Sequence, residues 1–215
     1  MKLGNWFGFP VDADGTALIV LAFLVLQSAK SGPAGMAMGF AFAIGIFLSV
    51  MAHELGHALV ARFFRLGPIS ITLSGFGGLT RYARAPKPWH GVLVTLAGPG
   101  AGFLLGGVLL VAGFFFPWGE DGALPLVWTL AAANIFLSVF NLLPMYPLDG
   151  GAVVSHALAI FIPRDAAMVW SARVGVPFAL LAGAYAAWAG QMFMGMIVLF
   201  SLMRSVPLAF SSTTR

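Results

Sequence analysis

The sequence predicts an all-α polytopic membrane protein with about six transmembrane helices and a small membrane-associated β-hairpin or sheet. Two observations carry this prediction. Hydrophobic residues make up 60% of the 215 residues and charged residues only 8%, whereas soluble domains carry about 25% charged residues. Apolar stretches long enough to cross a bilayer also recur along the chain. A separate soluble domain would need a polar stretch of at least about 50 residues, and none exists, so residues 1–215 are expected to form one membrane-embedded domain.

The first part of the chain contains an N-terminal arm and two predicted spans. Residues 3–13 are short and broken by Pro10, so we interpret them as an interfacial strand or coil. Residues 16–29 form the first predicted span, which is short for a bilayer. A turn at 30–33 leads into the second predicted span, 35–64.

A strand pair is predicted directly after the second span. Residues 69–74, Ile-Ser-Ile-Thr-Leu-Ser, alternate apolar and polar side chains and include β-branched residues, a pattern typical of a strand. The Gly-rich residues 75–78 supply a turn, and 79–82 form a returning strand. A β-hairpin is therefore expected between the second and third spans.

The second half of the chain alternates apolar segments with Gly-rich and Pro-rich breaks. The third predicted span is 90–116, interrupted by Gly-Pro-Gly at 98–100, and the fourth is 124–143. Two prolines prevent a continuous helix through 141–151. A short apolar helix is expected at 152–162.

The basic residues decide the tail and the orientation together. The tail, 174–208, is compatible with one long helix or with two spans meeting near residues 190–191. Two tail spans and an inward N-terminus leave Lys30 outside with Glu120 and Asp121, and place the other ten of the eleven basic residues inside, as the positive-inside rule requires. These ten are Lys2, Arg62, Arg65, Arg81, Arg84, Lys87, Arg164, Arg173, Arg204 and Arg215. We therefore expect a multi-pass protein of the cell membrane with both termini in the cytoplasm. The lipid bilayer is its expected environment, and nucleic acid is not an expected partner because no polybasic run occurs.

The second predicted span carries the one cluster of metal-ligand residues. His53, Glu54 and His57 form the pattern His-Glu-x-x-His. Residues four apart on a helix are rotated by about 400°, so the two His stack on one face, a turn apart. Two imidazoles so placed can bind one Zn²⁺, and the adjacent Glu can act on a metal-bound water. Ionisable groups inside a bilayer are costly and usually functional, so the motif predicts a zinc site.

The third zinc ligand must come from another segment. Catalytic zinc takes three protein ligands and keeps one position open, but residues 58–119 contain no carboxylate. Asp149 is the best candidate, because the topology brings it to the same side of the membrane as the end of the second span. His90 and His156 remain alternatives, although each is also interpretable as an interfacial or packed histidine. The chain has no Cys, which excludes thiolate ligands.

Two motifs in this order resemble the site-2 protease family, whose members are zinc metalloproteases that cut transmembrane substrates within the membrane. His-Glu-x-x-His lies inside a span, and Asn-x-x-Pro-x-x-Pro-Leu-Asp-Gly-Gly follows a later one. The resemblance covers nearly the whole chain, which looks like a minimal form without a PDZ or CBS domain. It implies that His53, His57 and Asp149 bind Zn²⁺, that Glu54 is the general base, and that Asn141 is a polar group near the substrate or oxyanion.

The resemblance implies one membrane-embedded metalloprotease domain, 1–215, that cleaves peptide bonds within or next to transmembrane segments of protein substrates. The alternative is a membrane metal carrier or a catalytically silent metal-binding scaffold. A carrier needs polar groups on both sides of the midplane, and the outer half of this chain offers almost none. A substitution of Glu54 distinguishes the protease from a carrier or scaffold, because only the protease requires this carboxylate.

The predicted hairpin has a proposed role in holding substrate. A transmembrane helix hides its peptide carbonyls in hydrogen bonds, so it must unwind before water can attack. A free strand edge offers partners to the released backbone groups. We interpret strand 69–74 as that edge; the alternative is that the hairpin only anchors its loop at the interface. The predicted substrate-binding residues are Ile71, Leu73, Gly75, Gly77 and Gly78.

Overall fold

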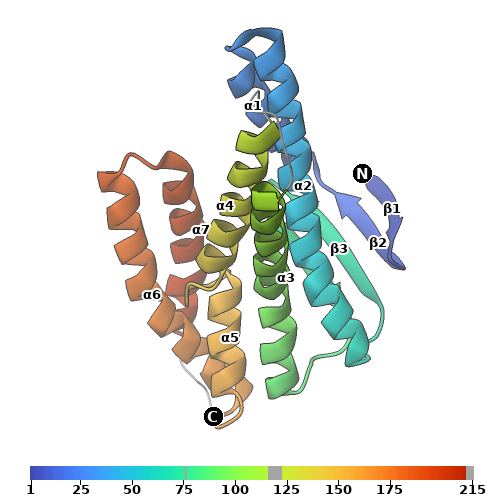
Figure 1. The fold of residues 1–215 in the computed structure, drawn as a ribbon. Coiled ribbons are helices and arrows are strands. Elements are labelled where there is room, and N and C mark those ends of the chain that lie inside the picture. The colour runs from blue at the N-terminus through green and yellow to red at the C-terminus, as the bar shows by residue number, and fades with distance from the viewer. Residues whose placement is uncertain (76, 116–122, 212–215) are drawn as a thin grey trace. The chain divides into compact units, whose positions relative to one another are not determined.

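A computed structural model describes residues 1–75, 77–115 and 123–211, and shows a mostly helical chain with one small sheet (Figure 1). The strands are β1 (Lys2–Trp6), β2 (Phe9–Ala13), β3 (Ile69–Ser74) and β4 (Gly77–Tyr82). The helices are α1 (Gly15–Ala29), α2 (Gly32–Phe63), α3 (Pro88–Phe115), α4 (Ala123–Asn141), α5 (Asp149–Leu158), α6 (Arg164–Trp188) and α7 (Met192–Ala209). Phe76, the predicted outer loop with Glu120 and Asp121, and Arg215 lie outside the described residues.

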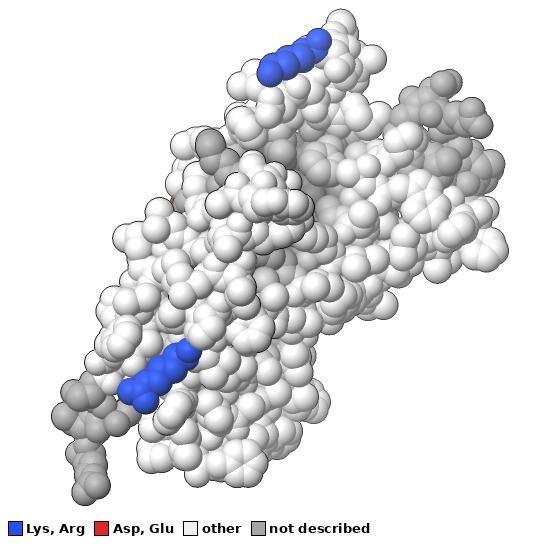
Figure 2. Space-filling model, turned by 90° about the vertical axis from the view of Figure 1, so that its left-hand side faces the viewer, with Lys and Arg blue, Asp and Glu red and all other residues white. Residues whose placement is uncertain are grey.

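Three of the described helices are long and apolar enough to cross a membrane, namely α2, α3 and α6. With 32 residues, α2 is roughly 48 Å long, which exceeds the hydrocarbon thickness of about 30 Å. Helix α1 and the apolar stretches Pro125–Asn141 and Met194–Ala209 are shorter. Figure 2 shows a face of the molecule almost without charged side chains, as expected for a lipid-facing surface. These features mark the chain as an integral membrane protein.

The chain divides into two compact units. The first unit comprises Met1–Ala85 and Ala97–Ser138, and the second comprises Pro86–Leu96 and Val139–Arg215. Within the first unit, α1 packs against α2, and the sheet lies alongside α2 (Figure 1). The His-Glu-x-x-His segment and the sheet therefore belong to the same compact unit.

The N-terminal arm is a strand pair that joins the sheet. Phe7 and Gly8 form a two-residue turn between β1 and β2, and both have positive φ angles, 52° and 85°, as tight antiparallel hairpins require. Asp14 then begins α1: its carboxylate accepts hydrogen bonds from the Thr16 hydroxyl and from the backbone N–H groups of Thr16 and Ala17. The Thr16 hydroxyl is the main cause of the lowered pKa of Asp14.

Strand β3 is an inner strand, so the interpretation of 69–74 as a free edge is wrong. The strand order is β1-β2-β3-β4, with β2 parallel and β4 antiparallel to β3. Ile71 and Leu73 are only 0% and 2% exposed, because their side chains lie in the core. Period-two alternation is the same in inner and outer strands, and the second neighbour of β3 comes from the distant N-terminal arm. The outer strand after α2 is β4.

Helix α3 runs without interruption through Gly98-Pro99-Gly100, contrary to the predicted break. Pro99 lies inside the helix and has no N–H to donate to the carbonyl one turn earlier. Transmembrane helices tolerate such prolines because neighbouring segments satisfy the freed carbonyl. Proline commonly ends helices in soluble proteins, but it is a weaker indication of a helix end within a membrane-spanning segment.

The second unit is built around the pairs α5 with α6 and α6 with α7. Its core is the cluster Phe140, Met145, Ala179 and Val198. The tail consists of two helices that separate at residues 189–191, which confirms the predicted break near Gly190-Gln191, although α6 begins ten residues earlier than expected, at Arg164. Arg173 of α6 donates from Nε to the Ala209 carbonyl at the end of α7, at 3.0 Å.

Candidate metal centre

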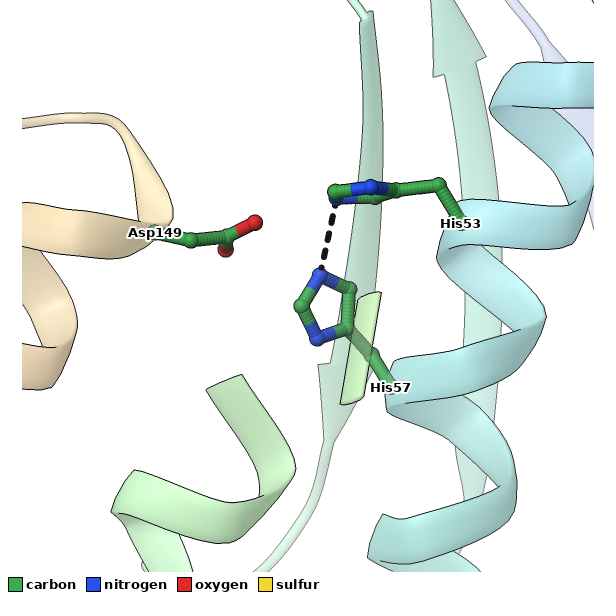
Figure 3. Close-up of side chains that lie close together, drawn as sticks. All are labelled: His53, His57 and Asp149. Carbon is green, nitrogen blue, oxygen red and sulfur yellow. Dashed lines mark hydrogen bonds between the residues drawn. The ribbon is translucent and has the colours of Figure 1, made fainter. Parts of the chain in front are cut away.

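Helix α2 presents two imidazole rings on one face. Figure 3 shows His53 and His57 projecting from adjacent turns of the helix, with their Nε2 atoms 3.1 Å apart. Two nitrogens bound to one tetrahedral zinc, each about 2.0–2.1 Å from the ion, would lie roughly 3.3 Å from each other. The pair thus has nearly the spacing that a shared zinc ion imposes. The two rings lie close together because the residues are four positions apart on a regular helix.

A glycine of α3 leaves room beside these nitrogens. A Cβ atom at Gly98 would lie 2.2 Å from Nε2 of His57 and 2.8 Å from Nε2 of His53. The two helices also approach closely at Gly56, where a Cβ would lie 2.3 Å from the carbonyl oxygen of Ala97. The space at the imidazole nitrogens therefore exists only because residue 98 has no side chain. Two imidazole nitrogens facing such a cradle suit a bound metal ion.

Glu54 is held between α2 and the outer strand β4. Its side chain is 4% exposed, and its Oε2 accepts a hydrogen bond from the Thr80 hydroxyl at 2.7 Å. A Cβ at Gly78 would lie 2.2 Å from Cγ and 2.5 Å from Oε1 of Glu54. The contacts place a buried carboxylate one residue from His53, where it can accept a proton from a reacting water. Sequence reasoning missed Thr80, and it gave Gly78 a role toward substrate only.

Gly75 and Gly77 of the hairpin are each required by a different structural feature. The Gly75 N–H donates to the Thr16 hydroxyl at 2.8 Å, and a Cβ there would lie 2.7 Å from the Thr16 carbonyl oxygen, so Gly75 packs against α1. Gly77 has a φ of +122°, which favours glycine, and its carbonyl accepts a hydrogen bond from the Ser74 hydroxyl at 2.9 Å. Of the predicted substrate-binding residues, Gly77 and Gly78 lie on the outer strand. Ile71 and Leu73 lie on the inner strand β3, and Gly75 packs against α1.

The second unit contains the predicted third ligand. Asn141 is the last residue of α4 and Asp149 the first residue of α5, and the residues between them are not helical. A Cβ at Gly150 would lie 2.2 Å from the carbonyl oxygens of both Leu142 and Leu143. The glycine after Asp149 therefore lets this loop fold back onto the first turn of α5.

Three buried serines hold this loop and helix start in place. The hydroxyls of Ser201 and Ser205, both on α7, donate to the carbonyl oxygen of Tyr146. The Ser171 hydroxyl of α6 donates to the carbonyl oxygen of Gly151 at 2.6 Å. All three serines are at most 1% exposed. Serine in an apolar helix is a weak sequence signal, and sequence reasoning did not find these contacts.

The alternative ligands, His90 and His156, both lie in the second unit and pack against neighbours there. The His90 ring contacts Trp89, with ring centroids 4.0 Å apart. His156 lies against Gly91, where a Cβ would be 2.5 Å from Nδ1. Close packing of both rings favours the packed-histidine interpretation over the ligand interpretation.

Comparisons with known proteins agree with the geometry of the site. The model of peptidase family M50 matches residues 41–121 and 117–182. A zinc metalloprotease of Methanocaldococcus jannaschii is 32% identical over 159 residues, covering 74% of this chain and 45% of that protein. A Synechocystis sp. protein with a zinc metalloprotease name is 32% identical over 192 residues, covering 85% of this chain and 50% of that protein.

A solved structure of a related protein matches over the full length of this chain. The site-2 protease from Methanocaldococcus jannaschii superposes with a TM-score of 0.72 at 25% identity, covering 100% of this chain and 97% of the solved chain. The chain spans about half the length of the curated relatives it matches. The family model covers most of the chain, including the His-Glu-x-x-His segment and Asp149, and this confirms the resemblance drawn from the two motifs: the chain belongs to peptidase family M50.

Proposed function

We propose that this chain is an intramembrane zinc metalloprotease that cleaves peptide bonds within or next to transmembrane segments of membrane proteins. The observation that carries the proposal is the buried Glu54 carboxylate, one residue from a pair of imidazoles whose Nε2 atoms lie 3.1 Å apart on a membrane helix. The zinc metalloprotease names of the relatives support zinc as the metal. Membership of family M50 supports proteolysis as the reaction.

Zinc is proposed to be held by His53, His57 and Asp149. Two imidazoles and one carboxylate are a common donor set of catalytic zinc, which leaves a fourth position for water or substrate. The described residues offer this donor set. One metalloprotease domain, 1–215, is proposed, because the family model matches residues of both compact units.

The proposed mechanism assigns the proton transfers to Glu54. Bound zinc supplies a Lewis acid that polarises the scissile carbonyl and makes a water molecule more acidic. Glu54 takes a proton from the attacking water as the new C–O bond forms, and returns it to the leaving nitrogen as the C–N bond breaks. The side-chain amide of Asn141 is proposed to donate a hydrogen bond to the substrate near the developing oxyanion.

Metal removal tests the proposed function directly. The purified chain in lipid vesicles is expected to cut a co-reconstituted transmembrane segment, to stop when a chelator removes zinc, and to resume when zinc is restored. Mass spectrometry of the products should place the cut within or next to the apolar segment. Cleavage that continues at the same rate in zinc-free, chelator-treated protein would rule out a metalloprotease.

The outer strand β4 is proposed to hold the unwound substrate. An unwound segment needs hydrogen-bond partners for its backbone in a poorly hydrated place, and a free strand edge provides them without regard to side-chain sequence. Among the described strands, β4 pairs only with β3, so one of its two edges has no neighbouring strand. It also contacts Glu54 through Gly78 and Thr80. This location supports β4, in place of 69–74, as the substrate-binding strand, with Gly77 and Gly78 at its start.

Amide hydrogen exchange distinguishes this role from simple anchoring of the loop. In an inactive Glu54→Gln protein, a bound transmembrane substrate is expected to slow exchange in β4, because substrate pairing protects the free amides of the strand. β1, the other outer strand of the same sheet, is the matched control and should not change. Unchanged exchange in β4, or equal protection of β1, would contradict the proposal.

Six spans with both termini in the cytoplasm are proposed for the topology, in the cell membrane. The support is the ten-to-one distribution of basic residues.

The absence of Cys makes a labelling test straightforward. In intact cells, a membrane-impermeant maleimide is expected to label Lys30→Cys, whereas Arg84→Cys and Arg204→Cys should react only after the membrane is opened. The three positions differ because only Lys30 lies on the proposed outer side. Labelling of Arg204→Cys in intact cells would show that the tail crosses the membrane an odd number of times.

A further inference from the structure

The hydroxyl of Thr80 on β4 makes a polar contact with the Glu54 carboxylate. Oγ1 lies 2.7 Å from Oε2 of Glu54 and 3.1 Å from the backbone carbonyl oxygen of the same residue. The single hydroxyl proton can go to either acceptor, and the shorter contact is with the carboxylate. A hydrogen bond from a neutral donor to a carboxylate is stronger than a hydrogen bond between two neutral groups.

The same strand also limits where the carboxylate can lie. Ile71 pairs with Thr80, and Leu73 pairs with Gly78, so both pairs face α2 from one side of the sheet. Gly78 leaves no space for a Cβ beside Glu54. The carboxylate is thus bounded by the backbone of Gly78 and directed by the hydroxyl of Thr80.

We propose that Thr80 is a positioning residue for the general base: its hydroxyl fixes the rotamer of Glu54 so that one carboxylate oxygen stays available for the reacting water. The inference rests on the proposed protease function. It assigns to the outer strand a second task besides holding substrate, because the strand that would pair with the substrate also orients the group that acts on it. The side chain of Thr80 touches neither substrate nor metal in this scheme.

Isosteric replacement separates positioning from folding. Thr80→Val keeps the β-branched shape and removes the hydroxyl, whereas Thr80→Ser keeps the hydroxyl. The matched control is Thr72→Val, the same change on the other face of the sheet in β3. In Thr80→Val, kcat is expected to fall about tenfold or more, with KM within about twofold, because backbone pairing with the substrate is unchanged. Thr80→Ser should recover most of kcat, and Thr72→Val should behave as the unaltered protein.

A spectroscopic measurement reports on the carboxyl group without any reaction. Glu54 and Glu120 are the only two Glu in the chain, so ¹³C-carboxyl-labelled Glu gives infrared bands from two side chains, and Glu120→Gln assigns them. Loss of the Thr80 hydrogen bond should shift the Glu54 carboxyl band in Thr80→Val. The band should return toward its original position in Thr80→Ser.

The outcomes of these measurements are distinct. Full activity in a parallel Glu54→Gln protein would overturn the proposed function itself. With Glu54→Gln inactive, an unchanged kcat or an unmoved Glu54 band in Thr80→Val would overturn the positioning role alone. Loss of zinc or a lowered unfolding temperature in Thr80→Val would show that Thr80 acts on the fold, and would also overturn it. A lower kcat with normal zinc content, a shifted band and rescue by Ser would establish it.

Discussion

Replacement of Glu54 by Gln is expected to lower the cleavage rate by at least about a hundredfold, the usual contribution of a general base, while zinc content stays near one ion per chain. Gln has the same shape as Glu but cannot take a proton from water. Its side-chain oxygen can still accept the hydrogen bond from Thr80, so the packing between α2 and β4 should persist. Cleavage in lipid vesicles and zinc analysis by atomic emission measure the two effects separately.

The contrasting variant is His57→Ala, which should lose both zinc and activity because it removes a proposed ligand. A Glu54→Gln protein with full activity would contradict the role of Glu54 and the protease proposal with it. A His57→Ala protein that keeps its zinc would contradict the proposed ligand set instead. The pair of variants therefore separates proton transfer from metal binding.

Introduction of one methyl group at residue 98 is expected to weaken zinc binding by at least about tenfold, as changes beside a metal ligand commonly do. In Gly98→Ala, the new Cβ would lie 2.2 Å from Nε2 of His57 and 2.8 Å from Nε2 of His53. Either the imidazoles rotate away or α3 shifts, and both responses move the ligand atoms. Competition with a zinc-binding dye measures the change in affinity.

The matched control lies two residues further along the same helix. A Cβ at Gly100 meets no atom within 4 Å, so Gly100→Ala should retain normal zinc affinity and gain slightly in helix propensity. Thermal unfolding of both variants shows whether any loss of zinc reflects a general loss of structure. Wild-type zinc affinity in Gly98→Ala would mean that the ion does not lie beside this glycine.

The common face of His53 and His57 on α2 was predictable from the sequence, because it depends only on residues that are close together in the chain. The four-residue spacing of His53 and His57 determines their common face on any regular helix, and the structure confirms their proximity. The alternation in 69–74 likewise predicts a strand, which β3 confirms. The break between the two tail helices was inferred from the distribution of basic residues, and the Gly190 region provides it.

Features that depend on contacts between distant segments were not predictable in the same way. The inner position of β3 depends on the N-terminal arm, and alternation within β3 carries no information about that neighbour. Thr80 is an ordinary strand residue by composition, so only the packing of β4 on α2 reveals its contact with Glu54. Gly98 was interpreted as a helix breaker, because its alternative role, space for the imidazoles, depends on how α3 lies against α2.

The parallel pairing of β2 with β3 also has a consequence for the order in which the protein is made. The paired residues, such as Val11 and Ile71, are about 60 residues apart in the chain, and α1 and α2 lie between them. At a synthesis rate of roughly 5–20 residues per second, β2 leaves the ribosome some 3–12 seconds before β3. During that interval Phe9 and Val11, both buried in the finished sheet, can pair with β1 but not yet with β3. The four-stranded sheet beside α2 can therefore be completed only after the first two helices have been synthesised.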